Sequence, residues 1–101
     1  MGFMRVARQD EIPSGTIREF QVEGQTIAIA KVGDKFYAIH NTCLHRGGPL
    51  AQGTLSGATV TCPWHGWQYD VTTGKLVANP TIGVKAFTIE VRGEDLWVDG
   101  A

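Results

Sequence analysis

The sequence predicts an all-β protein made of short antiparallel strands that are separated by turns. Glycine accounts for 13 of the 101 residues and recurs at short intervals. β-Branched and aromatic residues, which favour strands, fill the segments between the glycines. No window sustains the apolar period of a helix beyond about two turns. The best candidate for helix is a single turn at residues 9–12.

The outer strands are predicted from apolar segments that flank turn residues. They cover residues 3–7, 17–22, 26–32, 35–39, 84–91 and 96–98. Gly33 and Asp34 form a two-residue turn that makes a hairpin of the third and fourth of these strands. A turn at residues 92–95 makes a second hairpin of the last two.

The middle of the chain is predicted to hold two irregular loops, at residues 41–49 and 62–66. Glycine and proline in these segments cannot continue a strand. Short strands surround the loops, at residues 54–55, 58–61, 67–70 and 76–77. The two loops are therefore expected at equivalent ends of neighbouring hairpins, where they can face each other.

Length and charge exclude several classes of protein. A chain of 101 residues predicts one domain, residues 1–101. The formal charge is −1 and no two basic residues are adjacent, which argues against nucleic-acid and polybasic membrane partners. No segment approaches the roughly 18 apolar residues of a membrane span, and residues 1–8 contain no signal-peptide core. We therefore expect a cytoplasmic monomer.

Both cysteines and two of the three histidines lie in the irregular loops, as Cys43-x-His45 and Cys62-x-x-His65. Thiolates and imidazoles are the ligands that zinc and iron–sulfur centres take. Zinc modules usually space paired ligands by two or more residues, whereas here each loop offers one Cys and one His. Zinc, and a disulfide with incidental histidines, remain the alternatives. A reddish-brown protein would exclude both.

The segments Cys-Leu-His-Arg-Gly-Gly-Pro-Leu and Cys-Pro-Trp-His-Gly-Trp-Gln-Tyr-Asp resemble the paired motif of the Rieske iron–sulfur family. The resemblance covers the whole chain and is greatest to the ferredoxin components of bacterial ring-hydroxylating dioxygenases. It implies a Rieske-like fold of small antiparallel sheets, with a cluster-binding subdomain of two loops at about residues 41–80. It also implies one Rieske-type [2Fe–2S] cluster as cofactor.

The resemblance assigns a role to each ligand. Cys43 and Cys62 would bind the buried iron as thiolates, and His45 and His65 would bind the outer iron. Two neutral histidines in place of two thiolates make the cluster less negative, and Rieske potentials accordingly span roughly −150 to +300 mV. Tyr69 stands where high-potential members have a tyrosine that faces the cluster. Their additional loop cysteines are missing here, which predicts a potential in the lower part of this range.

Three glycines and four apolar residues complete the expected site. Gly47, Gly48 and Gly66 would permit backbone conformations that aim N–H groups at the sulfurs. The apolar rim that meets each partner is expected to consist of Leu44, Pro49, Leu50 and Trp64.

The implied function is that of an electron carrier in aromatic hydrocarbon catabolism. It would pass single electrons from an NAD(P)H-dependent flavin reductase to a terminal ring-hydroxylating oxygenase, through transient contacts. Catalysis by the chain itself is not expected. Only His40 remains for a mononuclear iron site, and the sequence has no Gly-x-Gly-x-x-Gly fingerprint. The alternative is a fixed subunit of an oxidoreductase complex, such as the small Rieske-like component of an assimilatory nitrite reductase.

Overall fold

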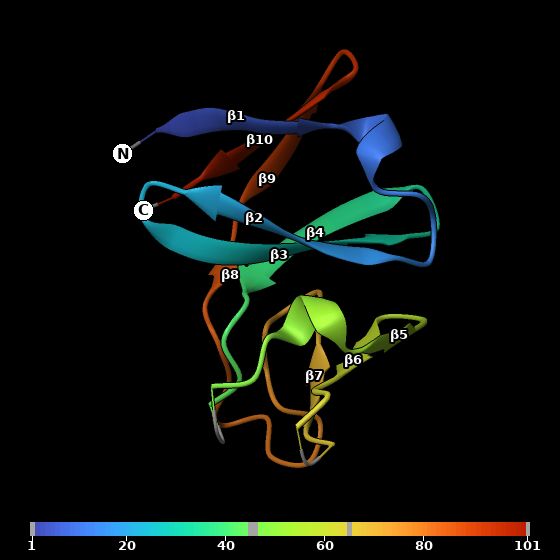
Figure 1. Cartoon of the computed structure of the whole chain (residues 1–101), viewed down its shortest axis with the longest axis vertical. Coiled ribbons are helices and arrows are strands. Elements are labelled where there is room, and N and C mark those ends of the chain that lie inside the picture. The colour runs from blue at the N-terminus through green and yellow to red at the C-terminus, as the bar shows by residue number, and fades with distance from the viewer. Residues whose placement is uncertain (1, 45–46, 65, 101) are drawn as a thin grey trace.

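The computed structural model describes residues 2–44, 47–64 and 66–100, which form three small antiparallel sheets (Figure 1). The first sheet has the order β1-β10-β9, with strands β1 Phe3–Arg8, β9 Ile89–Arg92 and β10 Asp95–Asp99. The second has the order β2-β3-β4-β8, with strands β2 Ile17–Val22, β3 Gln25–Val32, β4 Lys35–His40 and β8 Ala86–Phe87. The third is β5-β6-β7, with strands β5 Thr54–Ser56, β6 Thr59–Thr61 and β7 Gln68–Asp70. The all-β prediction is confirmed.

Two short 3₁₀ helices accompany the sheets: η1 Gln9–Glu11 and η2 Leu50–Gln52. The first confirms the helical turn predicted at residues 9–12, and the second was not predicted. The described ranges hold no helix of the length and apolar character that a bilayer span requires.

One predicted strand is divided between two sheets. Residues 84–91 were expected to form a single strand, but β8 pairs with β4 in the second sheet and β9 pairs with β10 in the first. Phe87 and Ile89, on either side of the break, both contact the core between these sheets. The alternation of apolar residues therefore continues across the break and gives no sign of it. The return strand expected at residues 76–77 is reduced to one bridge, between Tyr69 and Leu76.

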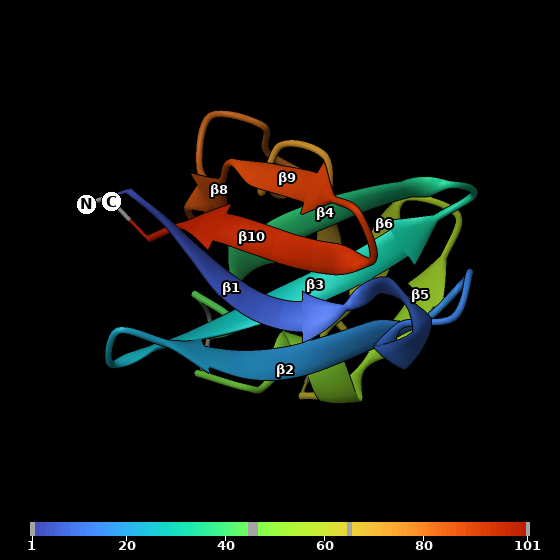
Figure 2. The same ribbon diagram turned by 90° about the horizontal axis from the view of Figure 1, so that it is seen from above.

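The first and second sheets pack face to face, as Figure 2 shows from above. Ile27 and Ile29 of β3 are fully buried between them and pack with Leu96 and Val98 of β10. This packing forms a core that contains neither predicted metal loop.

The opposite face of β3 supports the predicted metal site. Ala28 and Ala30 alternate with the two isoleucines and belong to a second core, which also contains Cys43, Cys62 and Tyr69. Because successive residues of a strand point to opposite faces, β3 presents large side chains to one core and small ones to the other. The small alanine side chains leave room on this face for the other residues of the second core.

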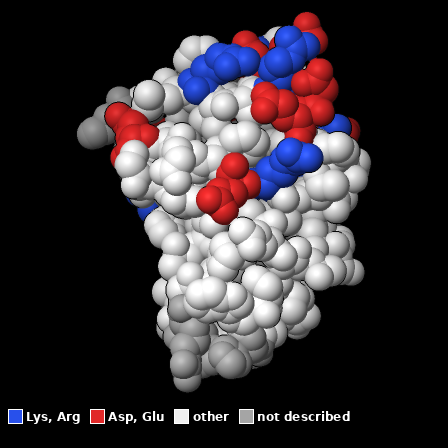
Figure 3. All heavy atoms as spheres, viewed as in Figure 1, with Lys and Arg blue, Asp and Glu red and all other residues white. Residues whose placement is uncertain are grey.

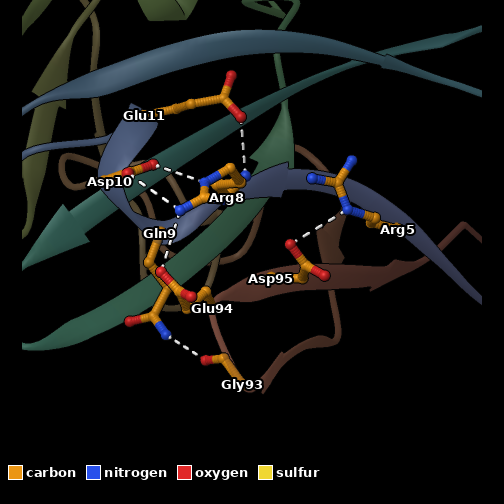
Figure 4. Close-up of polar contacts among 8 residues, drawn as sticks. All are labelled: Arg5, Arg8, Gln9, Asp10, Glu11, Gly93, Glu94 and Asp95. Carbon is orange, nitrogen blue, oxygen red and sulfur yellow. Dashed lines mark hydrogen bonds and ion pairs between the residues drawn. The ribbon is translucent and has the colours of Figure 1, made fainter.

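Charged side chains gather at the end of the molecule away from these loops (Figure 3). Figure 4 shows how they join β1 and η1 to the β9–β10 turn. Arg8 Nη2 lies 3.0 Å from Glu94 Oε1, and Arg5 Nε lies 3.2 Å from Asp95 Oδ1. These pairs are exposed to solvent, so each contributes little to stability. Residues 41–80, in contrast, include three charged side chains, Arg46, Asp70 and Lys75.

Candidate metal centre

The first loop follows β4 and folds back on itself around Cys43. Cys43 donates its backbone N–H to the carbonyl oxygen of Gly48 (2.9 Å) and accepts from the N–H of Gly47 (2.9 Å). Thr42 and Pro49 form a bridge across the base of the loop. These contacts turn the Cys43 side chain into the second core, where the residue is 2% exposed. His45 lies outside the described residues.

The second loop joins β6 to β7 and holds Cys62 in a similar way. The N–H of Cys62 donates to the carbonyl oxygen of Trp67 (2.7 Å), which closes the loop. The N–H of Trp64 lies 3.4 Å from Cys62 Sγ and donates to it. Cys62 is also 2% exposed. His65, the other predicted ligand in this loop, lies outside the described residues.

The two cysteines come together in one buried core, and neither forms a disulfide. Burial raises the pKa of the Cys62 thiol, and the neighbouring Cys43 thiol raises it further. A thiolate is thus costly here unless a cation lies beside it, and a bound metal ion supplies such a charge. The site therefore offers two buried thiols, and each sulfur has a hydrogen-bonding group beside it. Such a pair of donors is suited to bind a metal through thiolates.

Tyr69 provides the hydrogen-bonding group at Cys43. Its hydroxyl oxygen lies 3.2 Å from Cys43 Sγ and accepts the N–H of Leu44 (3.0 Å). Burial, followed by the Cys43 thiol, raises the pKa of Tyr69 to about 12. The hydroxyl therefore keeps its proton at neutral pH and can donate it in a hydrogen bond to a thiolate.

Gly48 is needed for space. A Cβ atom at this position would lie 2.8 Å from Cys62 Sγ and 3.0 Å from Cγ of Trp64. The first loop therefore touches the second at Gly48. Gly47 and Gly66 have positive φ angles of 73° and 78°, as the predicted conformational role requires. Gly48 was predicted to adopt a conformation that other residues avoid, and this is wrong because its φ is not positive. Glycine is needed there because the close packing leaves no room for a side chain.

The predicted apolar rim is partly wrong. Leu44 and Trp64 are 51% and 49% exposed, as expected, and Pro49 is half-buried. Leu50 has no exposed surface, because it begins η2 and packs into the second core. Val77 and Ile82, in the segment after β7, are exposed apolar residues that were not included in the predicted rim.

His40 ends β4 and lines a cleft between the first loop and residues 83–85. Its Nδ1 accepts the N–H of Thr42 (3.3 Å). This contact supports the conformation at the start of the first loop, as expected of a structural residue.

Asn41 was not singled out from the sequence. It is buried at the start of the first loop, with hydrogen bonds to Glu19 and Ala51. The available signal was its position, a polar residue directly after an apolar strand and two residues before a candidate ligand.

Within residues 2–44, 47–64 and 66–100, no three His, Cys, Asp or Glu side chains form a group that could hold a metal. The structure thus brings together two of the four predicted ligands, Cys43 and Cys62.

Comparison with known proteins identifies the family. Residues 2–89 match the model of the Rieske [2Fe-2S] domain. The chain is 35% identical over 100 residues to Ferredoxin CarAc of Metapseudomonas resinovorans, covering 97% of this chain and 94% of the relative. It is 32% identical to the ferredoxin component of the naphthalene 1,2-dioxygenase system of Pseudomonas aeruginosa, covering 88% of this chain and 86% of the relative.

A solved structure agrees with these matches. A chain in the complex of reduced oxygenase and oxidized ferredoxin in carbazole 1,9a-dioxygenase superposes with a TM-score of 0.88 at 34% identity. The match covers 97% of this chain and 93% of that one. The predicted Rieske-like fold is thereby confirmed.

The relatives that match along most of their own length are ferredoxin components, which confirms the prediction of an electron carrier rather than an enzyme. The chain belongs to the Rieske [2Fe-2S] family, and its cofactor is a Rieske-type [2Fe–2S] cluster.

Proposed function

We propose that Cys43, His45, Cys62 and His65 hold the cluster, with the two thiolates on one iron and the two imidazoles on the other. The burial of both cysteines in the second core supports their place on the inward iron. His45 follows Leu44 in the chain, and His65 follows Trp64. Since Leu44 and Trp64 are half exposed, we assign the imidazoles to the side that meets partner proteins.

The bound cluster supplies a one-electron couple. Two ferric ions, two sulfides and two thiolates sum to zero charge when both histidines are neutral. The protein stabilises the electron-rich reduced state by directing donors at the sulfurs. Trp64 directs its backbone N–H at Cys62 Sγ, and Tyr69 directs its hydroxyl at Cys43 Sγ.

The chain would carry single electrons from an NAD(P)H-dependent flavin reductase to a terminal aromatic-ring-hydroxylating oxygenase. The observation that carries this proposal is the near full-length match to Ferredoxin CarAc, at 97% of this chain. The carbazole dioxygenase complex, in which a similar ferredoxin accompanies the oxygenase, supports the identity of the acceptor. We further propose that the chain is a single domain that acts as a cytoplasmic monomer, with its cluster-binding subdomain at about residues 41–80.

The docking surface would be the apolar end of the molecule. Leu44, Trp64, Val77 and Ile82 are each 43–51% exposed and belong to the loops around the site. Few charges accompany them, because residues 41–80 include only Arg46, Asp70 and Lys75. An interface of this kind is transient and depends on shape and apolar contact.

Reconstitution with a flavin reductase and a terminal oxygenase tests the function. His65→Cys adds a thiolate, makes the cluster more negative, and should shift the midpoint potential toward the roughly −400 mV of all-thiolate clusters. Oxygenase turnover should then fall at least tenfold, which corresponds to an increase of about 1.4 kcal/mol in the effective activation free energy. Exposed Glu94→Gln, at the opposite end, is the matched control and should leave turnover unchanged.

Unchanged turnover with His65→Cys would refute His65 as a ligand. A native protein that elutes from size exclusion only as part of a larger complex would instead identify a fixed subunit, such as that of a nitrite reductase.

Electron transfer to the oxygenase should depend weakly on salt. Raising the ionic strength from about 0.05 to 0.5 M should change the rate by less than about threefold, because few charges surround the docking surface. A steep fall of the rate with salt in stopped-flow measurements would contradict an apolar docking surface.

Trp64→Ser should weaken docking and raise the KM for the ferredoxin, without loss of the cluster.

Tyr69→Phe should lower the midpoint potential. The change removes the hydroxyl at Cys43 Sγ, and hence a hydrogen bond that stabilises the reduced state. A loss of about 1 kcal/mol corresponds to roughly 40 mV for a one-electron couple. Protein-film voltammetry measures the shift, and Tyr37→Phe on β4 is the control. A potential equal to that of the unmodified protein would show that the hydroxyl makes no contact with the cluster environment.

Gly48→Ala should prevent normal cluster assembly. The added methyl group would collide with Cys62 Sγ and the Trp64 ring, so that the two loops must separate. We expect a stability loss of about 1–3 kcal/mol and a large fall in iron and sulfide content. Gly57→Ala is the control, since a Cβ atom there meets nothing within 4 Å and only its positive φ of 59° adds strain. A full cluster complement in Gly48→Ala would contradict the close packing.

A further inference from the structure

Asn41 is a buried amide at the base of the first loop. In the described part of the chain, and leaving tyrosine and cysteine out, Asn41 is the one polar or charged residue that is buried. Its exposed fraction is 4%. It lies directly after β4 and two residues before Cys43. A buried amide is costly unless its polar atoms are hydrogen-bonded, so its contacts indicate what it does.

The carbonyl oxygens of Asn41 hold the two ends of the loop together. Its side-chain Oδ1 accepts the N–H of Ala51 (2.8 Å), and its backbone oxygen accepts the N–H of Leu50 (2.7 Å). Both donors lie in η2, at the far end of the loop. Residues 41 and 50–51 are thereby fixed side by side, and the Cys43 backbone turns between them.

The nitrogen atoms of Asn41 attach this closed loop to the second sheet. Nδ2 donates to Glu19 Oε1 on β2 (3.2 Å), and the backbone N–H donates to the Thr26 oxygen on β3 (3.0 Å). The bond to Glu19 is charge-assisted, which makes it stronger than a neutral one. It also favours asparagine over aspartate at position 41, because Nδ2 donates to the Glu19 carboxylate and a second carboxylate cannot.

We propose that Asn41 is a positioning residue that fixes the Cys43 loop on the sheet. Its hydrogen bond to Glu19 sets how tightly the protein holds the cluster. The same bond sets the electronic environment of the Cys43 sulfur. The inference rests on Cys43 being a cluster ligand. Its physical basis is that a ligand loop closed at its base and attached to a sheet restricts the movement of the thiolate toward solvent.

The polarity of the Asn41–Glu19 hydrogen bond can be reversed without changing the net charge. Asn41→Asp keeps the acceptor for Ala51 but places two carboxylates together. Adding Glu19→Gln restores a donor–acceptor pair in the opposite direction. Glu19→Gln alone keeps an acceptor oxygen for Asn41. Glu19→Ala removes the partner and leaves the loop sequence intact, and Glu90→Ala, an exposed carboxylate on β9 that pairs with Arg92, is its charge-matched control.

The variants are compared as cluster-loaded proteins at about pH 8.5, well above usual carboxyl pKa values. The readouts are the rate of cluster loss to a chelator and the EPR spectrum of the reduced protein. Asn41→Asp should lose its cluster at least about tenfold faster and show a broadened spectrum, because repulsion replaces a charge-assisted bond. The double variant should return to within about threefold of the unmodified rate, with a native spectrum, and Glu19→Gln alone, which keeps a neutral hydrogen bond to Asn41, should stay within the same range.

Two outcomes would overturn the role of Asn41. One is a double variant that loses its cluster as fast as Asn41→Asp does. The other is a Glu19→Ala variant that loses its cluster no faster than Glu90→Ala does. If Asn41→Asp does not assemble a cluster, the proposal is still tested by comparing the double variant with the unmodified protein, and Glu19→Ala with Glu90→Ala. A Cys43→Ser arm separates failure of this proposal from failure of the ligand assignment, because retention of the native spectrum there would refute Cys43 as a ligand. None of these readouts requires a reductase or an oxygenase.

Discussion

The site depends on the second core, in which Cys43 and Cys62 are buried together with Ala28 and Ala30 of β3. Ile27 and Ile29 fill the core on one side of the strand, while Ala28 and Ala30 leave space on the other. Cys43 and Cys62 belong to the core on that side, and both residues are 2% exposed. Because a core is densely packed, the sulfur positions are set by the same contacts that stabilise the fold. The protein can therefore transfer an electron with little rearrangement around the cluster.

Each cysteine sulfur also has its own hydrogen-bonding group, from Tyr69 at Cys43 and from Trp64 at Cys62. Tyr69 is fully buried on β7, and its hydroxyl is held between Leu44 N–H and Cys43 Sγ. Trp64 supplies its backbone N–H to Cys62 Sγ and its ring to the contact with Gly48. Donors that point at the sulfurs stabilise the more negative reduced state, whereas burial of charge opposes it. These two effects oppose each other in setting the potential, in addition to the charge of the ligands.

Local signals in the sequence predicted most strands and the ligand loops. The Gly33–Asp34 turn predicted the hairpin of β3 and β4, because a two-residue turn fixes the pairing of its flanking strands. What the sequence could not show depends on tertiary packing. The break between β8 and β9 is hidden because Phe87 and Ile89 face the same core. Likewise, the burial of Leu50 and the close approach at Gly48 depend on elements distant in the chain.

The distribution of charge divides the molecule by role. Ion pairs join β1 to the β9–β10 hairpin at one end of the molecule. The other end carries Leu44 and Trp64, which are half exposed within the two cysteine loops. The proposed carrier would meet a reductase and an oxygenase with one surface, and a strong charge of one sign on that surface would favour one partner over the other. An apolar surface with few charges can contact both partners weakly, and weak contact permits the rapid release that a carrier requires.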